Sequence, residues 1–155
     1  MKKTGKLQTV YVCYHQSSLS SVARYQPLQP EYVLAPYLSA VKGFKSRKLI
    51  SRFRCGCHGF HVDTGRLLPL AQQVPREQRH CVFCTSGSAE DEHHFVFDCP
   101  AYCAIRNRFT NILWGPASTL SSFCTLYDPK VIARFLRDCF EHRNTLMAAQ
   151  TGHNL

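Results

Sequence analysis

The sequence predicts a mostly α-helical fold: a small, irregular domain stabilised by a metal ion, with an extended N-terminal arm. Three observations support this fold class. Apolar residues recur at helical spacing in segments 37–55, 100–113 and 129–143. Cysteines and histidines gather between residues 81 and 99. One short run, Thr9–Tyr14, is β-branched and aromatic, so at most a short β element is expected.

The length of 155 residues is that of one domain. Residues 1–36 contain three prolines and several serines, so we expect an extended or poorly ordered arm. Residues 37–148 are expected to form the helical domain, and residues 149–155 a disordered tail. The longest nearly apolar stretch has six residues, far below the roughly 20 that span a bilayer. We therefore expect no membrane association, no targeting segment, and a location in the nucleus or cytoplasm.

The first two helices are predicted from periodicity and from their end signals. Segment 37–55 alternates apolar with basic residues, and Gly56 marks its end. A short helix is expected from Ala89 to Asp98. Ser88, followed three residues later by Asp91, resembles a capping box at its start.

Two further helices each begin with a proline. Pro100 suits the first position of a helix, and Asp128 and Pro129 suit the cap and first position of the last one. We expect the apolar stripes of both helices to be core. They comprise Tyr102, Ile105, Phe109, Ile112 and Leu113 in the first, and Val131, Ile132, Phe135, Leu136, Cys139 and Phe140 in the second. The helix 129–143 is also a candidate surface for a protein partner.

Nine cysteines, an odd number, favour metal ligation over a framework of disulfides. The clearest set reads Cys81-x2-Cys84-x9-His94-x4-Cys99. Zinc takes four thiolate or imidazole ligands in a tetrahedron, and two cysteines separated by two residues can bind one ion from a turn. Because four protein ligands leave no open position for water, we expect one zinc ion with a structural role.

The spacing leaves the fourth ligand open. Replacing His94 with His93 gives a gap of five residues before Cys99. Using Cys103 instead gives an all-cysteine pattern, C-x2-C-x14-C-x3-C.

A second group of potential ligands lies upstream and reads Cys55-x-Cys57-His58-x2-His61. Four ligands within seven residues are too tightly spaced for one unstrained tetrahedral site. We expect these residues to shape the turn after the basic helix, although two or three of them could join another site.

Positive charge is concentrated in the first half of the chain. Residues 1–80 hold 13 Lys and Arg against three acidic residues, and residues 81–155 hold 6 against 7. Such a basic surface attracts polyanions, of which nucleic acid is the usual one. We expect the contacts to come from Lys42, Lys45, Arg47, Lys48, Arg52, Arg54, Arg66 and Arg79. The competing interpretation is that Arg52 and Arg54 pair with the acidic run 90–92 inside the domain.

Three stretches together resemble the zinc-binding segment that follows the reverse transcriptase in non-LTR (LINE-type) retrotransposon polyproteins. They are Ile50–Arg66, Arg79–Cys84 and Glu90–Tyr102. In that family an acidic run leads into a His-Phe pair, then Cys-Pro, an aromatic residue and a helix bearing an arginine, here Arg106 or Arg108. The resemblance covers residues 48–108, about 40% of the chain, and is looser outside them.

The resemblance implies that zinc is bound by Cys81, Cys84, His94 and Cys99, and that the segment binds nucleic acid during target-primed reverse transcription. The chain shows no Tyr-x-Asp-Asp polymerase signature and no endonuclease. We therefore expect a non-enzymatic, retrotransposon-derived module that binds DNA or RNA with low sequence specificity.

Two other functions are compatible with the sequence. One is a zinc-stabilised protein-interaction or orphan protein with no role in nucleic-acid binding. The other is a metal-dependent nuclease using the run Asp91, Glu92, His93 and His94. The nuclease is disfavoured because four consecutive helical residues fan around the helix axis and cannot converge on one ion.

Overall fold

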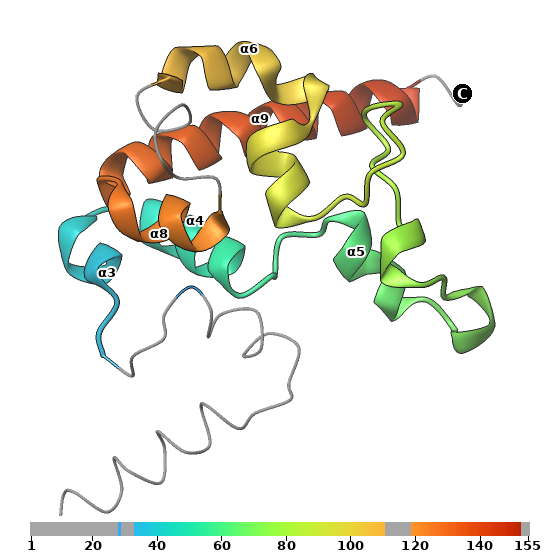
Figure 1. The fold of residues 1–155 in the computed structure, drawn as a ribbon, viewed down its shortest axis with the longest axis horizontal. Coiled ribbons are helices and arrows are strands. Elements are labelled where there is room, and N and C mark those ends of the chain that lie inside the picture. Colours follow the sequence, from blue (N-terminus) through green and yellow to red (C-terminus); the bar gives the residue numbers. More distant parts are fainter. Residues whose placement is uncertain (1–27, 29–32, 111–118, 153–155) are drawn as a thin grey trace, which may run out of the picture.

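The structure is a computed structural model that describes Leu28, residues 33–110 and residues 119–152 (Figure 1). The strand expected at Thr9–Tyr14 lies outside the described residues, as do Ile112 and Leu113. Within the described part, helices and short turns follow one another, and the β pairing is an isolated antiparallel bridge between His80 and Ala89. The predicted mostly α-helical class is therefore confirmed.

Helix α9 (Pro129–Gly152) is the longest element, and α3, α4 and α6 all pack against it. Its start is the predicted one, because the Asp128 carboxylate accepts a hydrogen bond of 2.9 Å from the backbone N–H of Lys130. Its apolar stripe is buried in the core, which leaves the polar face of the helix for any partner. The helix continues past Arg143 to Gly152, so residues 149–152 are helical, whereas the sequence predicted a tail there.

Segment 37–55 forms two helices where one was expected. They are α3 (Pro36–Ala40) and α4 (Phe44–Arg54), separated at Val41–Gly43, with Gly43 in the N-cap position of α4. The Tyr37 and Ser51 hydroxyls lie 2.8 Å apart and join the two helices. Gly56 has a φ of 62°, the left-handed conformation that ends many helices, as predicted.

The core is a cluster of aromatic rings contributed by segments far apart in the sequence. Phe53 of α4, Phe60 and Phe95 are each at most 1% exposed, and the ring centroids of Phe60 and Phe95 are 4.6 Å apart. Phe123 of α8 (Leu120–Leu126) and Phe135 of α9 complete the cluster, with their ring centroids 5.8 Å apart. Burial of these side chains holds the short helices around α9.

Arg79 closes a loop of short turns that projects from the body of the molecule. Its guanidinium donates to the carbonyl of Val62 at 2.7 Å and to the carbonyl of Val74 at 3.0 Å. Gly65 lies beneath it, and a Cβ at that position would approach the Arg79 Cδ to 2.7 Å. The short elements of this segment, in chain order up to Arg79, are α5 (His61–Thr64), η2 (Gly65–Leu67), η3 (Leu70–Gln72) and η4 (Arg76–Gln78).

After the loop the chain enters the cysteine-rich segment. Its elements are η5 (His94–Asp98), η6 (Pro100–Tyr102), α6 (Cys103–Arg106) and η7 (Asn107–Phe109). As predicted, a helical segment opens at Pro100, although it alternates between 3₁₀ and α geometry. Tyr102 and Ile105 are buried and Phe109 is half-buried, so this stripe belongs to the core.

Candidate metal centre

Four side chains converge on one point: Cys81, Cys84, His94 and Cys99. Their potential ligand atoms all lie within 4.8 Å of one another. The sulfur atoms of Cys81 and Cys99 are 3.8 Å apart, and the Cys84 sulfur is 3.3 Å from His94 Nε2. In a tetrahedral site with Zn–S bonds of about 2.3 Å, two sulfur ligands are about 3.8 Å apart. The donor set and its spacing therefore fit a tetrahedral metal ion.

Cys81 and Cys84 are held by a narrow loop that the backbone closes on itself. The Cys81 N–H donates to the Ser88 carbonyl at 2.8 Å, next to the bridge between His80 and Ala89. Gly87 has a φ of 72°, a conformation that most side chains disfavour, so this glycine allows the loop to reverse. The loop that carries both thiols is thus closed by its own backbone hydrogen bonds.

His94 and Cys99 are joined by a π-helical turn, η5. The Cys99 N–H donates to the His94 carbonyl at 2.7 Å, five residues back. In an α-helix, residues five apart point about 140° away from each other, because each residue turns about 100°. A π-helical turn is wider and brings them to the same side, which explains how a gap of four residues can supply two ligands.

The start of this segment differs from the prediction. The Asp91 carboxylate accepts a hydrogen bond of 2.9 Å from the His94 N–H, so Asp91 acts as the cap. Ser88, which the sequence predicted as the cap, is engaged through its carbonyl with Cys81. The expected helix Ala89–Asp98 is therefore shorter and begins after Asp91.

The structure selects among the alternative ligands. His94 is 3% exposed and directs Nε2 at Cys84. His93 is exposed, and its Nδ1 lies 3.0 Å from the Asp98 carboxylate. Cys103 is also exposed and is not part of the converging group. His94 is thus the residue placed to complete the site.

The sulfur atoms of Cys81 and Cys99 are close enough to form a hydrogen bond with each other. A hydrogen bond from Cys99 lowers the pKa of Cys81 to about 5, and the same bond, together with burial, raises the pKa of Cys99. A metal that binds both sulfur atoms as thiolates displaces the remaining proton. Elsewhere, burial raises the pKa of Cys124 to about 11 and that of Cys139 to about 12. Both pack in or against the core, and the position of Cys139 there is the predicted one.

The acidic run that precedes the ligands faces the interior of the domain. Glu90 is 2% exposed and pairs with Arg143, while the Asp91 carboxylate lies 3.5 Å from the guanidinium of Arg76. The competing interpretation of the sequence also places this run inside the domain, with Arg52 and Arg54 as its partners. Arg52, one of them, is exposed and donates to the carbonyl of Cys57 at 2.9 Å.

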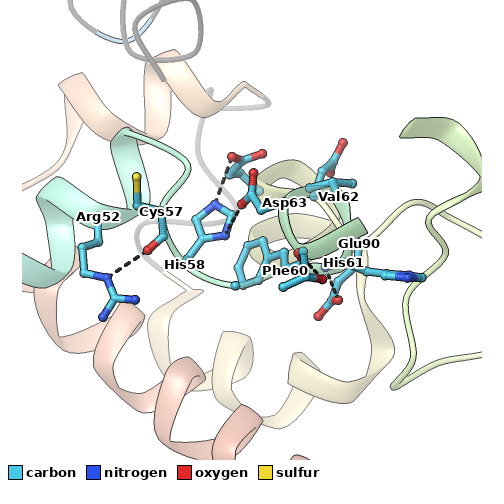
Figure 2. A network of polar contacts seen from close by, with 12 residues as sticks. Arg52, Cys57, His58, Phe60, His61, Val62, Asp63 and Glu90 are labelled. Atoms are coloured by element: carbon cyan, nitrogen blue, oxygen red, sulfur yellow. Dashed lines mark hydrogen bonds and ion pairs between the residues drawn. The ribbon is translucent and has the colours of Figure 1, made fainter. Parts of the chain in front are cut away.

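His58 is a buried residue whose environment the sequence did not reveal. Its Nε2 lies 3.0 Å from the Glu92 carboxylate, and its Nδ1 lies 3.0 Å from Asp63 (Figure 2). The contact with Asp63 is poorly aligned for a hydrogen bond and is mainly electrostatic. The ring therefore joins the turn after α4 to the segment that carries the metal ligands, across 34 residues of sequence.

These three residues form a second group that could hold an ion. However, each carboxylate already contacts a nitrogen of the His58 ring. The guanidinium of Arg76 is also 3.7 Å from Glu92, and its charge opposes a cation there. We interpret the group as a structural brace, consistent with the expected turn-shaping role of this segment.

The residues predicted to contact nucleic acid divide into two sets. Lys42, Lys45, Lys48 and Arg52 are exposed, and Arg47 is half-buried. Arg54 is 3% exposed and donates to the carbonyl of Leu28 at 2.7 Å. Arg66 and Arg79 are half-buried in the projecting loop. The first set leaves positive charge in solvent, whereas the guanidiniums of Arg54 and Arg79 are used to hold the fold together.

Comparison of the chain with protein-family models, with curated proteins and with solved structures gives no match.

Proposed function

We propose that the chain is a non-enzymatic zinc-binding module that binds nucleic acid with low sequence specificity. The convergence of three cysteine sulfurs and one imidazole at tetrahedral spacing carries the proposal. Thiolate ligands select zinc over magnesium or calcium, which prefer oxygen. Because all four positions are protein groups, the zinc has a structural role, and in comparable sites binding contributes about 10–16 kcal/mol.

The nucleic-acid part of the proposal is supported by the exposed side of α4. Lys45, Lys48 and Arg52 are three and four residues apart, so they lie on one face, which we call the basic face. Ile50 and Phe53 point the other way into the core. None of the described acidic residues forms an ion pair with the basic face, so its charge is available to phosphates.

We further propose that the module derives from the segment that follows the reverse transcriptase of non-LTR retrotransposons. The order of the ligands supports this origin, together with the acidic run before them and the Cys-Pro-x-aromatic sequence at Cys99–Tyr102. Such an origin agrees with a role limited to binding, since the polymerase signature is missing from this chain. None of the described helices has the length and apolar character to cross a membrane.

An alternative role in binding protein is favoured by one observation. The projecting loop carries Leu67 and Leu70, which are 78% and 85% exposed. Exposed leucines that lie close together are common at protein-binding surfaces. A protein-interaction module would oligomerise or bind a partner without affinity for nucleic acid.

Two measurements on the purified, reduced protein test the proposal. Elemental analysis should find about one zinc per chain, as expected for a closed four-ligand site. Binding of a labelled oligonucleotide should weaken with salt, with a log–log slope of about −3 for four phosphate contacts from Lys42 and the basic face. Binding that does not depend on salt, or no binding, would reject the nucleic-acid role and favour the interaction module.

A further inference from the structure

A pocket of about 250 Å³ opens between α4 and α9 beside the basic face. Leu49 and Arg52 line it from α4, Phe140 and Asn144 line it from α9, and His58 contributes from the turn after α4. Arg52 and Asn144 are exposed, so they lie at the mouth, whereas His58 is buried and Phe140 is half-buried. Figure 2 shows Arg52 reaching back to the carbonyl of Cys57, next to His58. Phe140 thus gives the pocket an aromatic wall, and Arg52 and Asn144 give it a polar rim.

We propose that this pocket receives one unstacked base of a single-stranded nucleic acid, an inference that rests on the proposed function. A nucleobase is flat, with π faces and an edge of hydrogen-bond donors and acceptors. The half-buried Phe140 supplies aromatic surface for the face. The Asn144 carboxamide supplies a donor and an acceptor for the edge, and no described residue forms a hydrogen bond with it.

The basic face extends along α4 to the mouth of the pocket, so it can bind the phosphates of a strand whose base enters the pocket. Lys45 and Arg52 are seven residues apart, so the face extends about 10 Å along the axis of α4. Arg52 uses its Nε for Cys57, which leaves its two terminal nitrogens for a phosphate at the rim.

A double helix can meet the basic face but not the pocket, because its bases are paired and stacked inside. The arrangement therefore selects single strands over duplexes. It also predicts that the bases, and not only the phosphates, contribute to affinity.

Fluorescence anisotropy on the zinc-loaded full chain tests this proposal. The probes are short labelled strands of DNA and of RNA, each compared with its own duplex and with an abasic DNA strand. Single strands should bind about tenfold more tightly than duplexes, within the range that one stacked base contributes. Asn144→Trp fills the mouth and should reduce the single-strand preference by about tenfold. Asn107→Trp, at an exposed asparagine of η7 away from the pocket, is the matched control and should retain it.

The outcomes separate the pocket from the broader function. Equal, salt-dependent affinity for single strands and duplexes would overturn the pocket while leaving nucleic-acid binding in place. Abasic strands that bind as tightly as strands with bases would also overturn the pocket. An unchanged preference for single strands over duplexes in Asn144→Trp would overturn it as well. If the wild-type chain binds none of the probes, the proposed nucleic-acid function fails together with the pocket.

Discussion

Glu90 and Arg143 form a buried ion pair in which Nη2 of the arginine lies 2.8 Å from Oε1 of the carboxylate. The arginine Nε donates to the same oxygen at 3.1 Å, and Nη2 also donates to the carbonyl of Gly59. The guanidinium lies 5.4 Å from the ring centroid of Phe60 and 5.1 Å from that of Phe83. Through this pair, α9 is joined to the segment that carries the metal ligands.

Removing one member of the pair should be costly. Arg143→Ala leaves the Glu90 carboxylate buried without its partner, and we expect the free energy of unfolding to fall by about 3–5 kcal/mol. Urea denaturation of the zinc-loaded protein, followed by circular dichroism, measures the change. Arg137→Ala, at an exposed arginine of the same helix, should change it by less than about 0.5 kcal/mol. Similar losses in the two variants would show that the pair does not stabilise the domain.

The two adjacent histidines offer a matched test of the metal ligand. His94→Ala removes a ligand, so zinc content and thermal stability should fall together. His93→Ala removes an exposed ring that contacts Asp98, and the zinc content should stay near one per chain. Elemental analysis and thermal denaturation measure the two quantities. Loss of zinc in His93→Ala but not in His94→Ala would show that His93, and not His94, is the ligand.

Thiol labelling should occur in three stages. In the native, zinc-loaded protein, exposed Cys57 and Cys103 should react first with an alkylating reagent at about pH 8. A chelator should then expose the three cysteines of the metal site. Cys139 should react only after unfolding, because burial raises its pKa to about 12 and the reactive thiolate is scarce. Peptide mapping by mass spectrometry identifies the labelled residues, and early labelling of Cys139 would contradict the described core.

The basic face can be tested through the salt dependence of binding. Replacing Lys45, Lys48 and Arg52 with glutamine removes three charges, which should flatten the log–log slope by about 2–3. The control replaces three exposed basic residues of α9 with glutamine, namely Lys130, Arg134 and Arg137. It removes the same charge from a different helix, so the slope should change little. Equal effects of the two triple variants would mean that binding depends on net charge and not on α4.

Features that depend on residues close in the sequence were predictable. The Cys-x2-Cys turn, the cap at Asp128 and the helix end at Gly56 are each set within a few residues. The apolar stripe of α9 was predicted for the same reason, since helical periodicity directly marks a buried face. His94 could not be separated from His93 by spacing alone, because the π-helical turn that chooses between them is not visible in the periodicity.

Contacts between distant segments were not predictable. His58 meets Glu92 across 34 residues, and Glu90 meets Arg143 across 53. The one signal was the acidic run itself, since three adjacent acidic residues in a domain this small need partners of opposite charge. Which cations supply that charge depends on how α9 packs, and no local pattern contains this information.

The loop closed by Arg79 has a practical consequence for work with this protein. The guanidinium holds the two ends of the loop through the carbonyls of Val62 and Val74. Residues 67–72, between those ends, are exposed and supply no ligand to the metal cluster. A fluorophore or an affinity tag inserted there would sit on a loop whose ends Arg79 holds together. It would also be separated in sequence from the metal ligands and from α4. The loop is therefore a suitable position for immobilising or labelling the domain.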